Sequence, residues 1–264
     1  MSLLQRFVVP VSALLAASGV SGCTVYSEPP RVSAGVAVRS APAQPPPGQP
    51  VIVAEPVDSA AFGEFHAALT PYGEWLDTPV CGRYLGRVWR PSPRYVGPDF
   101  VPYATGGEWV ATDQGWSFVS DWEWGWATFH YGRWCADPRF GWVWAPGTQW
   151  APAWVDWRYG GGYVGWAPLP PAGIALRDEL FFFVDRGTFA GTRVTRYALP
   201  RERVTEARRV TRSHRRPVQN NNYTWNAGPP ADEIRDARGR PVQPVHVAPP
   251  ASGTVRPVIV RPRH

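Results

Sequence analysis

The strongest structural signal of the chain is the stretch "GWATFHYGRWCADPRFGWVWAPG", residues 125 to 147. Its Trp126, Trp134, Trp142 and Trp144 each lie near a glycine. In "FGWVWAP" the aromatic residues alternate, which is typical of a β-strand whose successive side chains point to opposite faces. The preceding "ADPRFG" contains the Asp, Pro and Gly that tight reversals need. We therefore predict a β-hairpin with Trp142 and Trp144 on one face.

The same pattern recurs along the chain. Each copy reads Gly-x-Trp, a turn that contains Asp, and then Gly followed by alternating aromatic residues. The copies are "GEWVATDQGWSFV" (107–119), "GRWCADPRFGWVWAP" (132–146) and a looser "GEWLDTPVCGRYLGRVWRP" (73–91). A last hairpin is predicted in 153–171, with strands at 153–158 and 163–167 joined at Gly160–Gly162. Repetition of this unit predicts a mainly β fold, built of antiparallel β-hairpin repeats rich in Trp and Gly, with a short helix before them and a small mixed C-terminal region.

The pairing of Trp with Gly is compatible with a core or with a binding surface. Glycine has no side chain, so an indole from a neighbouring strand can lie flat over its backbone. An indole buries about 200 Å², and fourteen of the fifteen tryptophans lie between Trp75 and Trp166. A dozen indoles can therefore replace an aliphatic core, and we predict that most of the tryptophans do so. Aromatic rings left over on an exposed face would instead be available to a ligand.

The N-terminus has the layout of a secretory signal. A charged start is followed by the apolar "FVVPVSALLAASGV" and by small residues before Cys23. We predict a signal peptide at 1–22, lipidation of Cys23, and a Pro-rich tether over 23–58. Because Thr24 rather than Asp follows the cysteine, the outer membrane is the expected location. An ordinary signal peptide with a periplasmic or secreted protein is the alternative.

Three further segments follow the tether. Residues 59–171 form the Trp-rich domain, which begins with a short helix that carries Phe62, Phe65 and Leu69 on one face. Residues 172–248 are predicted as a basic mixed α/β extension, in which "PRERVTEARRVTRSHRR" is ambiguous between helix and strand, "PPADEIRDARG" predicts a short helix and "PVQPVHV" an edge strand. Residues 249–264 are predicted to be a disordered tail. Seventeen arginines against eight acids after residue 171 predict a solvated basic face, with contact to anionic envelope partners as the alternative, and an envelope location makes nucleic acid a poor partner.

Motifs such as "FHYGRW", "FGWVWAPG" and "GYVGWAPLPP" resemble a bacterial family of Trp/Tyr/Gly-repeat envelope proteins, catalogued only as a domain of unknown function (family sixty-six hundred). The resemblance runs from about Phe62 to Pro171, with weaker similarity to about Val247. It implies a secreted or envelope-anchored protein with no assigned reaction, so it provides no catalytic residue. Cys81, Cys135 and an insertion in "CGRYLGRVW" depart from the family pattern.

If Cys23 is lipidated, Cys81 and Cys135 remain in an oxidising compartment, where a disulfide between them is expected. Two separately buried thiols are the alternative. A zinc site formed by both cysteines with His66 and His130 has no close-paired ligand spacing to support it. We predict no metal and no cofactor.

The richest aromatic stretch suggests where a ligand would bind. In "WEWGWATFHYGRW" a strand would place Trp122, Trp124 and Trp126 on one face, followed by His130 and Tyr131. These five residues are the predicted ligand site of a non-catalytic envelope lipoprotein that scaffolds or binds peptidoglycan, lipopolysaccharide or another envelope polymer. The alternative is a carbohydrate-active hydrolase that uses two of the carboxylates Glu108, Asp121, Glu123 and Asp156. No G-x-S-x-G, H-E-x-x-H or phosphate-binding loop is present.

Overall fold

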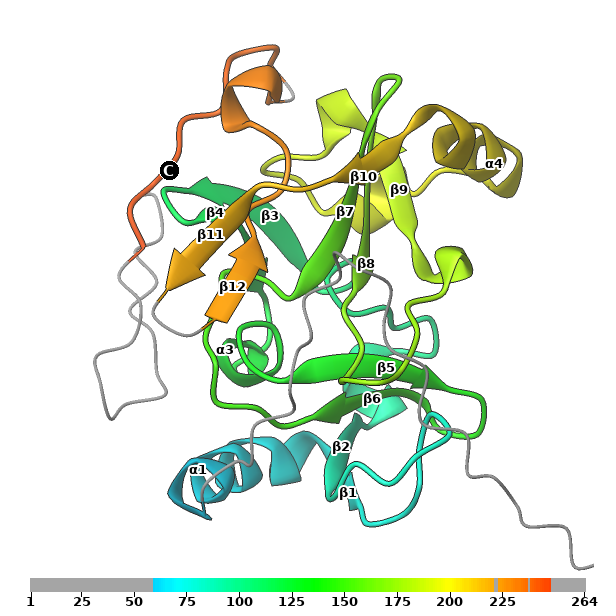
Figure 1. Cartoon of the computed structure of the whole chain (residues 1–264), viewed down its shortest axis with the longest axis vertical. Coiled ribbons are helices and arrows are strands. Elements are labelled where there is room, and N and C mark those ends of the chain that lie inside the picture. The colour runs from blue at the N-terminus through cyan, green and yellow to red at the C-terminus, as the bar shows by residue number, and fades with distance from the viewer. Residues whose placement is uncertain (1–58, 221–222, 237, 248–264) are drawn as a thin grey trace, which may run out of the picture. The chain divides into compact units, whose positions relative to one another are not determined.

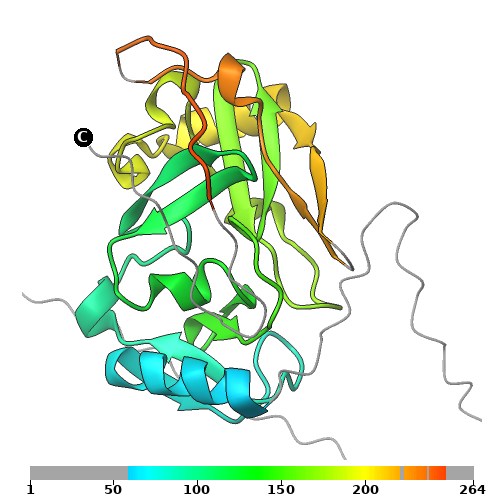
Figure 2. The same cartoon turned by 90° about the vertical axis from the view of Figure 1, so that its left-hand side faces the viewer.

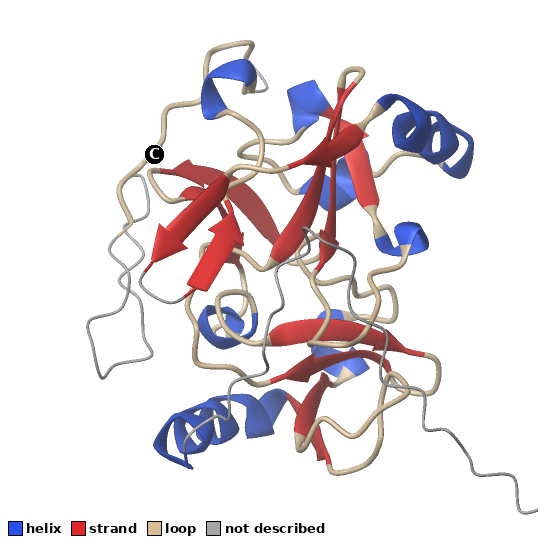
Figure 3. Ribbon diagram, viewed as in Figure 1, coloured by secondary structure: helices blue, strands red, loops and turns tan. Residues whose placement is uncertain are grey.

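Strands outnumber helices in the described part of the chain, and the helices between them are short (Figure 3). The computed structural model describes residues 59–220, 223–236 and 238–247. Every pairing between its named strands is antiparallel, so the predicted mainly β fold of antiparallel hairpins is confirmed. The predicted signal peptide 1–22, tether 23–58 and tail 249–264 lie outside the described residues.

The strands of the described residues are β1 (Gly73–Leu76), β2 (Val88–Pro91), β3 (Gly107–Thr112), β4 (Gly115–Ser120), β5 (Arg133–Asp137), β6 (Gly141–Ala145), β7 (Val155–Gly160), β8 (Tyr163–Pro168), β9 (Phe182–Asp185), β10 (Arg212–His214), β11 (Pro217–Asn220) and β12 (Tyr223–Asn226). The α-helices are α1 (Ser59–Leu69), α2 (Pro93–Val96), α3 (Gly125–Thr128) and α4 (Arg201–Val210). Single 3₁₀ turns are η1 (Thr70–Tyr72), η2 (Asp178–Leu180), η3 (Arg186–Thr188), η4 (Val194–Tyr197) and η5 (Ala231–Glu233).

Two copies of the predicted hairpin join into one sheet of order β1-β2-β6-β5 (Figure 1). The register is symmetrical, because Trp75 lies opposite Trp89, Trp89 opposite Trp144, and Trp144 opposite Trp134. Trp89 and Trp144 occupy the same place in "VWRP" and "VWAP". The two copies therefore meet through equivalent residues, in an approximate two-fold relation.

A glycine lies against an indole in each of these two copies. A Cβ on Gly73 would come within 2.6 Å of Trp89 Nε1, and a Cβ on Gly132 within 2.7 Å of Trp144 Cε2. Both indoles also donate their N–H to a main-chain carbonyl oxygen, at 3.0 Å from Trp89 and 2.8 Å from Trp144. Glycine is required because any side chain would occupy the space that the indole fills.

The predicted last hairpin is β7–β8, whose turn includes Gly161 and Gly162. It forms the middle of a second sheet of order β10-β7-β8-β9, in which β9 pairs with β8 and β10 pairs with β7. Strand pairing thus runs across residue 171, where the composition of the chain changes.

The β3–β4 hairpin places Trp109 inside the largest hydrophobic cluster. Its ring centroid lies 4.8 Å from Trp157, 5.4 Å from Phe118 and 5.5 Å from Trp166. Eleven tryptophans are buried: Trp89, Trp109, Trp116, Trp124, Trp134, Trp144, Trp150, Trp154, Trp157, Trp166 and Trp225. For these eleven, the core role of the indole is confirmed.

The helices form only in part as the sequence predicts. α1 forms as predicted and buries Phe65 and Leu69. The ambiguous arginine-rich segment contains both a helix, α4, and a strand, β10. The helix predicted after Pro230 is a single 3₁₀ turn, because Ile234 adopts an extended conformation and enters the core. Among the described residues, none of the helices has the length and apolarity that a membrane crossing needs.

The predicted edge strand "PVQPVHV" makes only two isolated bridges, from Pro241 to Arg235 and from Val245 to Thr112, the second beside the β3–β4 hairpin (Figure 2). Pro241 and Pro244 lack N–H groups, so this segment cannot form a regular ladder.

Substitution of Gly132 tests the indole contact. Gly132→Ala should lower the free energy of unfolding because a Cβ there meets Ala145 O and the Trp144 ring, with a cost of about 1–3 kcal/mol from overpacking. Its φ of +59° adds about 1–2 kcal/mol. Gly141→Ala is the matched control, because Gly141 has φ of +70° but no atom within 4 Å of a Cβ. Urea unfolding should show the larger loss for Gly132→Ala, and equal losses would contradict the contact model.

Candidate functional site

The strand predicted to carry Trp122, Trp124 and Trp126 does not form. The chain turns after Ser120 and enters the short helix α3. The main-chain N–H of Trp122 donates to Ser120 Oγ at 3.1 Å, a local side-chain bond that competes with continuation of a strand. The three indoles therefore do not share a strand face, and the prediction of a flat row of tryptophans is wrong.

Most of the five predicted ligand residues belong to the core. Trp124, His130 and Tyr131 are at most 2% exposed, so a ligand cannot reach them without opening the fold. Trp122 and Trp126 are partly buried. The Trp122 ring stacks on Trp124 at 4.8 Å with an interplanar angle of 5°.

His130 has a structural role. Its Nδ1 lies 3.1 Å from Ala151 O, and its ring stacks on Trp150 at 6.0 Å. Burial lowers the pKa of His130 to about 4, because the effect of burial outweighs that of the main-chain hydrogen bonds that favour the charged form. The imidazole is therefore neutral near pH 7 and is enclosed.

A different set of aromatic residues is accessible. Tyr95 on α2 is 54% exposed, and its ring meets Tyr72 edge-on at 5.4 Å. Tyr72 Oη donates to Glu123 Oε2 at 3.1 Å. The hydrogen bond to Glu123 and the charge of that carboxylate raise the pKa of Tyr72, so the phenol stays protonated. We call Tyr72, Tyr95 and Glu123 the Tyr95 surface.

The carboxylates of the hydrolase alternative make contacts that do not require a catalytic role. Asp121 forms an ion pair with Arg193, and Glu123 accepts the hydrogen bond from Tyr72. Burial raises the pKa of Asp156 on β7, against the opposing effects of a main-chain hydrogen bond and nearby arginines.

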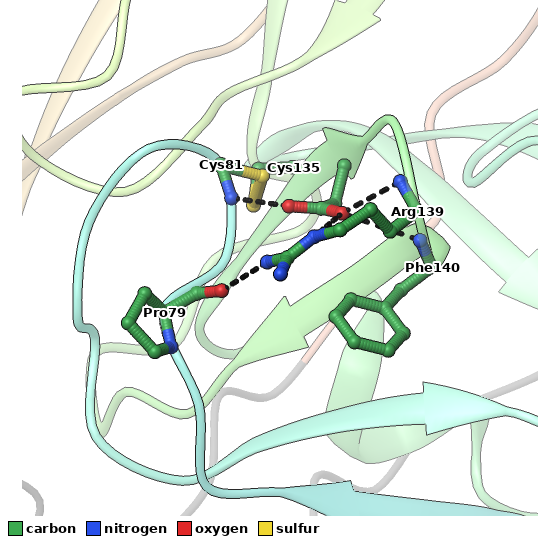
Figure 4. Close-up of polar contacts among 6 residues, drawn as sticks. Pro79, Cys81, Cys135, Arg139 and Phe140 are labelled. Carbon is green, nitrogen blue, oxygen red and sulfur yellow. Dashed lines mark hydrogen bonds and ion pairs between the residues drawn. A yellow bond between two sulfur atoms is a disulfide. The ribbon is translucent and has the colours of Figure 1, made fainter.

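A disulfide links the two hairpin copies of the first sheet. Cys81, in the loop between β1 and β2, is bonded to Cys135 on β5, with Cα atoms 6.5 Å apart (Figure 4). Of the two alternatives for these cysteines, the structure shows the disulfide. Its sequence separation of 54 residues corresponds to about 4 kcal/mol of stabilisation by loop entropy. The thiols are oxidised and cannot be zinc ligands, and the described residues contain no group of three or more His, Cys, Asp or Glu that could hold a metal.

Asp137, the last residue of β5, holds the same loop between β1 and β2. Its buried carboxylate accepts hydrogen bonds from the main-chain N–H groups of Cys81 at 2.6 Å, Arg139 at 2.8 Å and Phe140 at 3.2 Å. Arg139 in turn donates to Pro79 O (Figure 4). Burial alone would raise the pKa of Asp137, but the three N–H donors and the Arg139 charge outweigh it and lower the pKa. The disulfide and Asp137 together fix the loop of one hairpin on the other.

The arginine-rich segment, residues 201–219, carries seven arginines and two glutamates. It forms α4, β10 and most of β11. Two of its arginines have acidic partners, since Arg203 pairs with Asp185 at 2.7 Å and Arg209 with Glu206 at 2.9 Å. The segment still keeps a clear excess of positive charge, most of it at the surface.

Sequence reasoning missed Tyr72, Tyr95 and Arg133. Tyr95 lies outside the repeated motifs, and its exposure depends on the short helix α2. Arg133 follows the Gly of a repeat, in the alternating pattern of β5, where a charged residue predicts an exposed side chain. The structure instead buries it, leaving 8% exposed. The predicted lipidation site Cys23 lies outside the described residues.

Replacement of Asp137 tests its role in holding the loop. Asp137→Asn should lower the free energy of unfolding at pH 7 by about 2–3 kcal/mol, because an amide N–H₂ would face main-chain N–H donors. Since the folded pKa is lowered, this contribution is present above the unfolded value near 3.9 and is lost as the pH falls through the folded pKa. Urea unfolding between pH 2 and 7 should show the difference shrinking in acid. Asp178→Asn at an exposed position is the control, and a pH-independent difference for Asp137→Asn would refute the carboxylate's role.

Comparison with known proteins agrees with the sequence pattern. A search of curated proteins and a search of solved structures each found no match. Residues 66–173, which include the first sheet, the β3–β4 hairpin and the β7–β8 hairpin, match the model of the family described as "Family of unknown function (DUF6600)".

Proposed function

We propose that the protein is a non-catalytic binding module of the cell envelope, and that the Tyr95 surface holds sugar rings of peptidoglycan, lipopolysaccharide or a related envelope polymer. The exposure of Tyr95 beside Tyr72 and Glu123 is the observation that carries this proposal. It replaces the five ligand residues predicted from the sequence.

The chemistry of these side chains suits a sugar. The apolar C–H face of a pyranose stacks on an aromatic ring, and a carboxylate accepts hydrogen bonds from its hydroxyl groups. Tyrosine provides an aromatic stacking surface with only two rotatable side-chain bonds, so little conformational entropy is lost on binding. Tyr72 is already held by Glu123 and by the Tyr95 ring, which further reduces the cost of ordering the site.

An oxidising compartment is supported by the disulfide between Cys81 and Cys135, since such bonds persist outside the cytoplasm. We propose anchoring through a lipid on Cys23, which would place the module at the outer membrane, with a periplasmic or secreted protein as the alternative. The positive charge of the arginine-rich segment suits an auxiliary contact with the phosphate groups of lipopolysaccharide or of lipid headgroups.

Substitution of Tyr95 tests the binding surface. Purified protein should be retained by peptidoglycan or lipopolysaccharide in a pull-down, and Tyr95→Ala should weaken retention about tenfold, as expected for the loss of one aromatic contact of about 1–1.5 kcal/mol. The melting temperature should not change, because the ring is mostly exposed.

Tyr84→Ala is the matched control. Tyr84 is 63% exposed in the loop between β1 and β2, and it donates to Asp77 rather than to the Tyr95 surface. Equal retention of both variants and the native protein would refute the site. No retention of the native protein on either polymer would favour a purely structural role.

Mass spectrometry of the mature N-terminus tests the anchor. We expect a first residue Cys23 that carries a diacylglycerol thioether and an amide-linked acyl chain. A mature peptide that begins at unmodified Thr24 or Val25 would show that the signal is cleaved without lipidation.

A further inference from the structure

Arg133 is a buried cation without an acidic partner. Its residue is 8% exposed, at the start of β5. Among the described residues it forms no ion pair, and its only hydrogen bond runs from Nη1 to the carbonyl oxygen of the preceding residue, Gly132, at 2.7 Å. Burying a charged guanidinium without a counter-charge is costly, so a reason for its retention is needed.

Trp154 provides the main contact of the guanidinium. The Arg133 Cζ atom lies 3.4 Å from the centroid of the Trp154 ring, which is a close cation–π stack. The indole is itself held, because its Nε1 donates to His130 O at 3.1 Å and to Gln149 O at 3.2 Å. The plane of the guanidinium is therefore set by a fixed aromatic ring.

One edge of the guanidinium is left without an acceptor. Nε is fully enclosed and has no hydrogen-bond partner, and no bond from Nη2 to a described residue is present. Nε and Nη2 form the side-on edge of arginine, whose two parallel N–H groups match the two oxygens of a carboxylate. Burial lowers the pKa of Arg133 to about 9, so the group still carries its charge near pH 7.

We propose that Arg133, stacked on Trp154, is a binding site for the carboxylate group of a ligand, such as a sugar acid. A carboxylate supplies the missing counter-charge and fills both free N–H positions in one plane. Because Nε is fully enclosed, the carboxylate reaches it by displacing the segment 146–149, which is partly buried and has no regular secondary structure. This segment borders the site, because a Cβ on Gly147 would lie 3.1 Å from Gly132 Cα and Gln149 O accepts the bond from Trp154.

A carboxylate is favoured over a phosphate by the shape and charge of the site. Both the stacked guanidinium and the carboxylate are planar, and one negative charge balances the one positive charge. This site shares no residue with the Tyr95 surface, so either can fail while the other holds.

The melting temperature of the full mature protein tests the site directly. Sodium glucuronate and sodium acetate are titrated against sodium chloride at constant ionic strength and pH 7. We expect glucuronate to raise the melting temperature of the native protein by several degrees along a saturable curve, as a ligand that binds only the folded state does. An equal response to acetate shows that the carboxylate alone is recognised, and a stronger response to glucuronate shows that the sugar ring contributes.

Arg133→Met keeps an unbranched side chain on Trp154 and removes the charge. In chloride it should melt at or above the native temperature, because replacing an unpaired buried charge by an apolar side chain is commonly neutral or stabilising. It should show no saturable response to either carboxylate. Arg201→Met is the control, since Arg201 is exposed and forms no ion pair with a described residue, and it should respond like the native protein.

Several outcomes would overturn the proposal. The native protein could show no saturable response to glucuronate or acetate, or could respond only to sodium phosphate in a parallel titration. Arg133→Met could keep the carboxylate response. If Arg133→Met does not fold, Arg133→Lys serves instead, because it keeps the charge and loses the two-pronged edge. Its curve should shift at least tenfold to higher glucuronate, and an unshifted curve would refute the bidentate site.

Discussion

The contact of an indole with a glycine backbone is the interaction on which the rest of the structure depends. In the first sheet it occurs twice, with Trp89 against Gly73 and Trp144 against Gly132. In each case the indole N–H also reaches a main-chain carbonyl outside the strand ladder. One side chain thereby joins a strand to the segment before its partner strand, which an aliphatic residue cannot do because it lacks a donor. The disulfide and Asp137 add a second link between the same two hairpins, on the side of the long loop.

The sequence predicted local structure well because local rules control it. The hairpins at 107–119, 132–146 and 153–171 follow from alternation and from turn residues, and the strands pair as those rules require. The pairing of β2 with β6 and the addition of β9 and β10 to the second sheet were not predictable in this way. They depend on which surfaces meet after the hairpins form, and composition carries no such information. The strand predicted between Ser120 and Thr128 does not form, and the cause is local. The Ser120 hydroxyl accepts a main-chain hydrogen bond and the chain enters a helical turn, although the aromatic residues alternate as in a strand.

The candidate site was harder to predict than the fold, because the exposure of each aromatic side chain decides whether a ligand can reach it. Trp124 and Tyr131 have the residue types of a sugar platform but are enclosed, whereas Tyr95 lies outside the repeats and is accessible. A protein with fifteen tryptophans needs most of them for its core, so richness in aromatic residues marks the interior rather than the ligand site. Arg133 shows the opposite case, in which a residue that alternation would place at the surface lies on an indole in the interior. Charge and ring type are visible in the sequence, but their burial is a property of the assembled sheets.

The polar atoms of the indoles explain why the basic C-terminal region belongs to the same structure as the repeats. Of the eleven buried tryptophans, eight donate their N–H to a carbonyl oxygen. Three of these bonds cross between the Trp-rich part and the C-terminal part: Trp116 to Pro229, Trp157 to Asn226 and Trp225 to Gln114. A buried donor without a partner is costly, so the repeats need carbonyls that their own short loops do not supply. The segment after residue 171 supplies two of them and inserts one further indole, and a change in composition there does not mark the end of the packed fold.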